Sequence, residues 1–467
     1  MGGINNKKNL YLFGIHAFIT FISVYSSMIG MAWGALILVF GVYHIINNRN
    51  ENNEAALYAA YFMALEVVLR VNKGSLSYEM GKYGVIIFLL TGLLFQQKPH
   101  FIPRQFIIFL LLLIPAISMV EMGDIDLERK TILFNLSGPV CLAISAMYFY
   151  KRPIDKETLY KIFLYIMLPI FSLGIILFLK TPDFSTVKFT ADSNASLSGG
   201  FGPNQVSTIL GLGIFIGAMA LILGYTLTSI KLLDIAIILF LTLRGLLTFS
   251  RGGVVAAVMG LGIALFFILK QRKDKKLIQQ VFIGSFVVII AGFGVWSYTN
   301  ELTGGALSIR YQGRSMNDPN KVSLTTGRID IMETELEAFY AYPILGTGVG
   351  MGRIYRINHG GADLVAHTEY TRLIGEHGIY GIIALLIMLF TPLSHFFKLS
   401  NDNKYFFASF IVIALFTMFH GAMRLAMPGF MYGISFIYIL SRNKPKPVLA
   451  TFPIYTPPHA LGSLSET

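Results

Sequence analysis

The sequence predicts an all-α, polytopic transmembrane helical bundle of about 12–14 spans, with one large extracytoplasmic loop that itself contains helices. Apolar residues make up 54% of the 467 residues and charged residues only 13%, whereas soluble proteins carry about 25% charged residues. Mean hydropathy is +0.64. Apolar runs of about 17–25 residues, the length that crosses a bilayer as a helix, recur along most of the chain.

Fourteen such runs are predicted as spans. They lie near residues 9–27, 29–46, 55–73, 80–97, 105–120, 130–149, 159–180, 206–223, 230–250, 251–270, 279–298, 373–394, 404–422 and 427–441. The number falls to twelve or thirteen if a short run is re-entrant. The chain thus divides into a block of about eleven spans (1–298), a large exterior loop (299–368), a three-span block (369–441) and a disordered cytoplasmic tail (442–467).

The charged residues orient these spans. With both termini in the cytoplasm, more than half of the 37 Lys+Arg residues fall on the inner side, as the positive-inside rule requires. The net charge of +12 is therefore largely a topology signal. It does not require a nucleic-acid partner, and none is predicted.

Arg251 lies where an arginine is costly, in the segment Leu247–Gly253 between two apolar runs. A charged side chain at mid-bilayer costs at least ~2.5–3.5 kcal/mol and by default indicates function. Arg244 precedes it by seven positions, on nearly the same helical face. The pair predicts a site for an anion such as a phosphate, and the alternative is that each arginine extends to the lipid headgroups.

A helix is predicted in the exterior loop over residues 326–340. Its apolar face is expected to comprise Ile329, Met332, Leu336 and Phe339, which recur at helical spacing. Arg328 falls in the first turn, where acidic residues are preferred and where the free N–H groups favour an anion. A bound phosphate would explain this arginine, and a local carboxylate from Asp330 or Glu333 is the alternative.

Glycines occur at every second position around Gly348, in the stretch 342–352. Such a loop can bind an anion through its backbone N–H groups. No strand precedes it, so it is not the dinucleotide-binding fingerprint.

His367 stands just before the span that begins near Tyr370, at the exterior membrane boundary. An imidazole titrates near neutral pH and suits general-base catalysis. His359, Asp363 and His367 are also spaced by four, as metal ligands on a helix would be, but Gly360 and Gly361 disfavour a regular helix and no metal is predicted.

Taken in order, these motifs resemble the O-antigen ligase and O-antigen polymerase superfamily of bacterial inner-membrane glycosyltransferases. The resemblance covers about residues 200–395. It rests on Ser250-Arg251-Gly252-Gly253 at a span end, Gly327-Arg328 in the large loop, Tyr342-Pro343-Ile344-Leu345-Gly346-Thr347-Gly348, and Ala366-His367 followed by Leu373 to Gly381.

The resemblance implies an enzyme that transfers a glycan from undecaprenyl pyrophosphate to an acceptor hydroxyl on lipid A-core, with its active site facing the periplasm. Arg251 and Arg328 would bind the pyrophosphate, and His367 would act as the general base with inversion at the anomeric carbon. Arg244, Asn204 and Gly348 are the further predicted substrate-binding residues. No cofactor is implied, and the membrane lipid itself is the remaining partner.

Two alternatives remain open. A related polymerase would use another lipid-linked repeat unit as its acceptor, with the same arginines and histidine. A polyanion or lipid-linked sugar transporter would bind a moving anion at Arg244 and Arg251, and would require pseudo-symmetric halves that the sequence does not display.

Overall fold

The computed structural model describes residues 8–97, 100–183, 187, 193–271, 275–314, 328–361 and 363–440. The predicted tail, Gly327 and the predicted start of the loop helix lie outside these ranges. The described elements are α1 (Lys8–Tyr25), α2 (Ser27–Asn47), α3 (Glu54–Val71), α4 (Met80–Phe95), α5 (Arg104–Leu112), η1 (Pro115–Met119), α6 (Ile125–Phe149), β1 (Pro153–Ile154), α7 (Lys156–Leu179), η3 (Ser196–Ser198), α8 (Pro203–Ile222), α9 (Lys231–Leu247), α10 (Arg251–Gln271), α11 (Lys275–Leu302), α12 (Ala306–Tyr311), α13 (Arg328–Ala341), α14 (Gly352–Asn358), α15 (Glu369–Lys398), α16 (Asn401–Gly421), α17 (Ala426–Ser435) and β2 (Tyr438–Ile439).

The predicted fold class is confirmed, because each of the fourteen apolar runs contains a helix and the only sheet described is the short parallel pair β1–β2. Seven helices among the described residues are long and apolar enough to cross a membrane: α2, α6, α7, α8, α10, α15 and α16. With nine residues in α5 and ten in α17, and a rise of 1.5 Å per residue, neither helix alone spans a hydrocarbon core of about 30 Å.

Helix α3 forms the centre of the bundle and is buried on nearly all its faces. It contacts α4 and α7 and is rich in alanine (Ala55, Ala56, Ala59, Ala60, Ala64). Small residues let helix backbones approach closely where there is no water to drive packing. Glu66 and Arg70 of this helix form a buried ion pair at 2.5 Å, as their spacing of four indicates.

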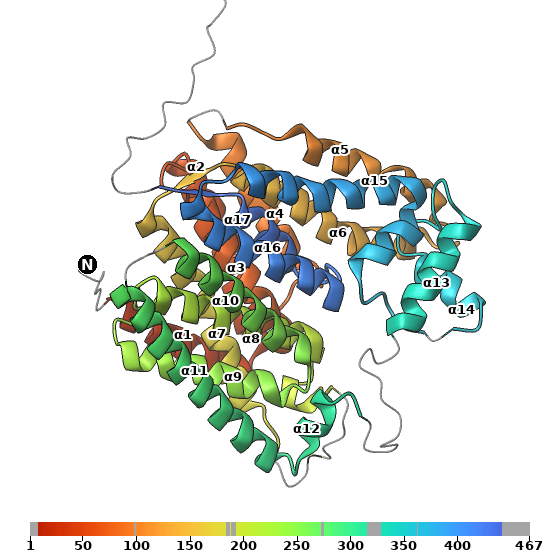
Figure 1. Ribbon diagram of the computed structural model, residues 1–467. Coiled ribbons are helices and arrows are strands. Elements are labelled where there is room, and N and C mark those ends of the chain that lie inside the picture. Colours follow the sequence, from red (N-terminus) through yellow and green to blue (C-terminus); the bar gives the residue numbers. More distant parts are fainter. Residues whose placement is uncertain are drawn as a thin grey trace, which may run out of the picture.

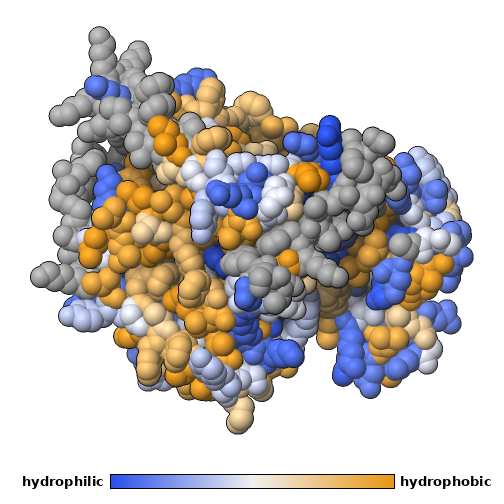
Figure 2. Space-filling model, turned by 90° about the horizontal axis from the view of Figure 1, so that it is seen from below, coloured by the Kyte–Doolittle hydropathy of each residue, from blue (hydrophilic) through white to orange (hydrophobic). Residues whose placement is uncertain are grey.

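The helices that position the site lie around α16. Helix α10 contacts α8 on one side and α16 on the other, and α16 contacts α17. At the other side of the molecule α15 lies along α5, and α13 and α14 contact its first half (Figure 1). The face drawn in Figure 2 is largely apolar over the body of the bundle, while hydrophilic side chains gather on the side of α13 and α14.

The predicted loop helix is present as α13, and the face that it packs against the protein is not the predicted apolar stripe. Ile331, Glu335 and Ala338 are buried, whereas Ile329 and Leu336 are 49% and 37% exposed. The reason is the contact with α15, where a Cβ at Gly375 would lie only 2.6 Å from the Glu335 carbonyl oxygen. This close approach turns a polar residue, and not the apolar stripe, toward the neighbouring helix.

Candidate functional site

Arg251 is the first residue of α10 and follows a sharp turn in which Phe249 has a φ of 56°. Its Nη1 donates to the carbonyl oxygen of Arg310 at 3.2 Å. Arg310, on α12, in turn donates from Nε to the Phe249 carbonyl oxygen at 3.0 Å. The two arginines thereby join α12 to the junction between α9 and α10.

The residues around Arg251 explain the Ser-Arg-Gly-Gly motif. Ser250 Oγ donates to Asn204 Oδ1 of α8 at 2.8 Å. A Cβ at Gly252 would come within 2.1 Å of the His420 ring, and one at Gly253 within 1.8 Å of the Ser207 carbonyl oxygen. The two glycines are therefore needed for α10 to lie against α16 and α8 at once.

Arg328, the first residue of α13, is half-buried, and its side chain reaches the His420 ring that lies against Gly252. Its Nη1 lies 3.0 Å from His420 Nδ1. Burial, followed by repulsion from Arg251, Arg310 and Arg424, lowers the pKa of Arg328 to about 10. In the described part of the chain none of the ion pairs includes Arg328, so neither Asp330 nor Glu333 provides the carboxylate considered above.

His367 lies in the segment before α15, beside these arginines. Burial, then the charges of Arg424, Arg328 and Arg356, lowers its pKa to about 4. Its Nδ1 is buried and has no hydrogen-bond partner within the described ranges. The imidazole is therefore neutral near pH 7, which is the form that can accept a proton.

Sequence reasoning missed two further residues of this cluster, His420 and Arg424. Arg424 donates from Nη2 to the carbonyl oxygen of Ala366, the residue before His367. Their signal was available: both are polar side chains spaced by four at the end of an apolar run, where an ionisable residue indicates function.

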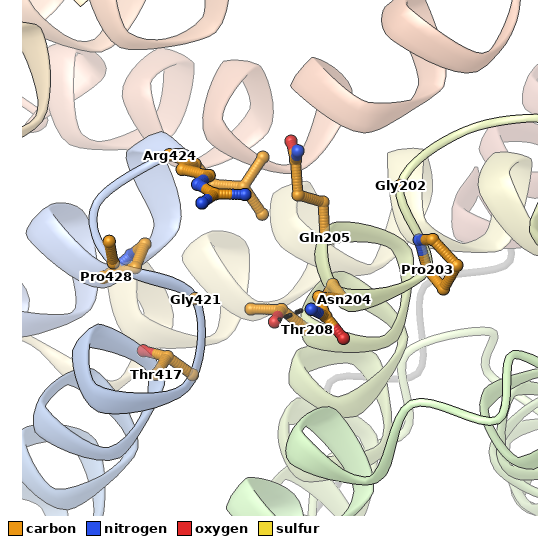
Figure 3. Close-up of a pocket in the computed structure, with 11 residues that line it drawn as sticks. Gly202, Pro203, Asn204, Gln205, Thr208, Thr417, Gly421, Arg424 and Pro428 are labelled. Carbon is orange, nitrogen blue, oxygen red and sulfur yellow. Dashed lines mark hydrogen bonds between the residues drawn. The ribbon is translucent and has the colours of Figure 1, made fainter. Parts of the chain in front are cut away.

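A cavity of about 200 Å³ opens beside Arg424, between the start of α8 and the junction of α16 with α17 (Figure 3). Arg424 and Gln205 project toward one another at its rim, and the Thr208 hydroxyl donates to the Asn204 carbonyl oxygen. The lining comprises Gly202, Pro203, Asn204, Gln205, Thr208, Thr417, Gly421, Ala422, Arg424, Leu425 and Pro428. Amides, hydroxyls and one guanidinium give this cavity the polar groups that a sugar or a phosphate binds.

The other predicted residues are placed as follows. Asn204 lines the cavity. Arg244 is directed away from the cluster and donates to the Leu177 carbonyl oxygen at 2.7 Å and to Thr181 Oγ1 at 2.6 Å. Gly348 has a φ of +101°, and its N–H donates to the Glu376 carbonyl oxygen at 3.1 Å. The glycine loop thus packs against α15, and the structure brings neither Arg244 nor Gly348 to the arginine cluster.

The side chains of His359, Asp363 and His367, whose spacing by four is that of metal ligands on a helix, do not come together. Arg353 binds both carboxylate oxygens of Asp363, and His359 Nδ1 lies 2.8 Å from the Tyr355 carbonyl oxygen. Among the described residues no group of three His, Cys, Asp or Glu side chains could hold a metal ion.

A bundle of apolar helices with a polar site at one end defines a multi-pass helical membrane protein. Residues 235–386 match the family described as O-antigen ligase, and this match supports the superfamily that the order of the motifs predicted. The match includes Arg244, Arg251, Arg328, Gly348 and His367. It supports a membrane glycosyltransferase-like enzyme that uses lipid-linked glycans. No curated protein matches the chain.

Proposed function

We propose that the protein is a ligase of this superfamily, which transfers a glycan from undecaprenyl pyrophosphate to a hydroxyl of lipid A-core on the periplasmic side of a bacterial inner membrane. The observation that carries the proposal is the surroundings of Arg328. Three other arginines repel its charge, and a pyrophosphate would relieve that repulsion while forming forked, charge-assisted hydrogen bonds with the guanidinium groups.

The reaction proposed is a single displacement. The acceptor oxygen forms a bond to the anomeric carbon, the bond from that carbon to the pyrophosphate oxygen breaks, and undecaprenyl pyrophosphate leaves with the bonding electrons. His367 takes the hydroxyl proton on its unpaired nitrogen. Arg251 and Arg328 stabilise the negative charge that develops on the leaving oxygen, and one displacement inverts the anomeric configuration.

The cavity beside Arg424 is proposed to receive the sugar next to the bond that breaks. Its volume of about 200 Å³ suits one sugar ring and not a long glycan, so the remaining units would extend outside the bundle. Asn204 and Thr208 offer hydrogen bonds to ring hydroxyls, and Arg424 offers a cation to the same group or to the adjoining phosphate.

Analysis of surface lipopolysaccharide in a deletion strain tests this function. Full glycan chains that are not attached to core indicate the ligase. Core that bears a single repeat unit indicates the polymerase, and unchanged lipopolysaccharide excludes both.

The membrane side can be tested separately. A reporter that is active only outside the cytoplasm is expected to be active when fused after Arg314 and inactive when fused after Lys275. The reverse pattern would put the arginine cluster on the leaflet opposite to the proposed donor, and would overturn the proposal.

A further inference from the structure

His420, at the end of α16, is held from both sides of its ring. Its Nδ1 lies 3.0 Å from Arg328 Nη1, and its Nε2 lies 3.4 Å from Ser250 Oγ. A guanidinium has donors and no acceptor, so Nδ1 accepts and the imidazole hydrogen is on Nε2. The Ser250 hydroxyl then uses its own hydrogen for Asn204 Oδ1 at 2.8 Å. Donors and acceptors therefore alternate along one chain from Arg328 to Asn204.

The place of the His420 ring is fixed by the helices around it. Gly252 leaves room for the ring, since a Cβ there would lie 2.1 Å away. The Ser207 hydroxyl donates to the Ser250 carbonyl oxygen at 2.7 Å and accepts from the Gly253 N–H at 3.2 Å. The far end of the chain is thus anchored to α8 and α10, which are packed helices of the bundle.

Arg328 itself belongs to a different part of the fold. It begins α13, and α13 packs against α14 and α15. The contact with His420 joins this arginine to α16, which packs against α10, the helix that begins with Arg251. A lone pair of the imidazole is used for that contact, so His420 is not available to take a proton from an acceptor, in contrast to His367 with its unpaired Nδ1.

We propose that His420 is a positioning residue for Arg328: it accepts a hydrogen bond from Nη1 and so directs the other guanidinium N–H groups at the pyrophosphate of the donor. This inference rests on the proposed function. The inference adds to the proposed function a reason for the separation of Arg251 and Arg328. This separation is set by the contact of His420 with Ser250 as well as by the packing of α13.

Two conservative substitutions separate this role from simple packing. His420→Asn places an amide oxygen where Nδ1 stood and can still accept from Arg328, whereas His420→Gln places its amide near the position of Nε2 and cannot. With a synthetic lipid-linked donor, His420→Gln is expected to lower kcat/KM by about 10–100-fold, the usual effect of losing a hydrogen bond to a charged group, and His420→Asn by no more than about 3-fold. Equal losses in the two variants would overturn the inference.

The double variant supplies the second criterion. In an Arg328→Ala background, His420→Gln is expected to change kcat/KM by less than about 2-fold, because coupled residues are not additive. If His420→Gln lowered kcat/KM in the Arg328→Ala background as much as it does in the wild type, His420 would act independently of Arg328. His395→Gln is the matched control: His395 is also buried, contacts Phe407 near the start of α16, and its substitution should leave activity at the wild-type level.

Binding of undecaprenyl pyrophosphate without a glycan distinguishes failure of this inference from failure of the proposed function. Wild type and His420→Asn should bind this probe alike, and His420→Gln and Arg328→Ala should bind it about 10-fold or more weakly. If the four proteins bind the probe with these relative affinities but transfer no glycan, the positioning role of His420 is supported and the proposed reaction is wrong. If all four proteins bind it equally and each melts at the wild-type temperature, the positioning role is wrong.

Discussion

Two groups of arginines, one buried around Arg372 and one half-buried around Arg328, differ in their partners. Arg372 on α15 lies between two carboxylates, and its Nη1 donates to Glu376 at 2.6 Å while Nη2 donates to Glu369. Arg356 pairs with Glu335 at 3.4 Å. Around Arg328, by contrast, the charged groups that shift its pKa are all arginines.

The difference indicates two uses of the same residue type. A buried arginine with carboxylate partners is satisfied when the chain folds, and removing one member leaves an uncompensated charge. Around Arg328, the charges of Arg251, Arg310 and Arg424 repel its guanidinium within the folded protein, and the proposed pyrophosphate would offset this repulsion. We therefore expect substitutions in the first group to affect stability and those in the second to affect activity.

Among the substitutions expected to affect activity, His367→Ala should lower turnover the most. Loss of the general base is expected to lower turnover by about 10²–10⁴-fold, while binding of the lipid pyrophosphate changes little because the arginines supply that attraction. Single-turnover kinetics and donor binding measure the two separately. A variant with normal turnover per folded molecule would remove His367 from the reaction.

Among the substitutions expected to affect stability, Arg372→Met should lower the free energy of unfolding the most. It leaves Glu369 and Glu376 without their cation, and breaking such a buried pair typically costs about 3–5 kcal/mol. The measurement is thermal unfolding in detergent. Because Glu369 also accepts from the Met423 N–H at 3.2 Å, activity should fall along with folding; a stable but inactive variant would contradict the division between the two groups.

Arg328→Ala, in contrast to Arg372→Met, should lower activity without lowering stability. We expect kcat/KM to fall by about 10²–10³-fold, as for removal of one charge-stabilising group, with a melting temperature equal to or above that of wild type since repulsion is relieved. Arg251→Lys should recover little activity because an ammonium cannot form a forked contact. Substantial unfolding of Arg328→Ala would place this arginine in the structural group.

The pH dependence of the reaction gives a smaller, more specific prediction. Because the pKa of His367 is lowered to about 4, kcat/KM should decline only below about pH 5. A bound pyrophosphate opposes the charges of Arg424 and Arg328, so the acidic decline of kcat should lie at higher pH. In His367→Ala both declines should be absent, and their persistence would assign them to another group.

The smallest effect is expected for the pH dependence of stability at Glu335. Burial raises the pKa of this carboxyl from 4.5 to about 7, so between these values the folded protein holds a proton that the unfolded chain has released. This group therefore lowers stability as pH rises from about 4.5 to 7. In Glu335→Gln that contribution is lost, and melting temperatures measured at several pH values should decline less over this interval.

The sequence alone was sufficient to predict the helices and their order, whereas the chemical character of the site stays a prediction. Long apolar runs form helices because the bilayer offers no partners to backbone N–H and C=O groups. Arg251 and His367 were singled out because charged and titratable groups at an apolar boundary are costly unless they are used, and Arg328 because an arginine is disfavoured in the first turn of a helix. The family match over residues 235–386 agrees with the order of those motifs.

Only the tertiary structure decided which polar groups meet. His420 follows Arg328 by 92 residues, and no local periodicity indicates that α16 brings the two together. Arg244 and Arg251 share a helical spacing, yet Arg244 donates to Leu177 because the end of α7 packs beside it. The partners of a buried side chain are set by helices distant in sequence, since each must satisfy its polar groups with whatever packing places within reach.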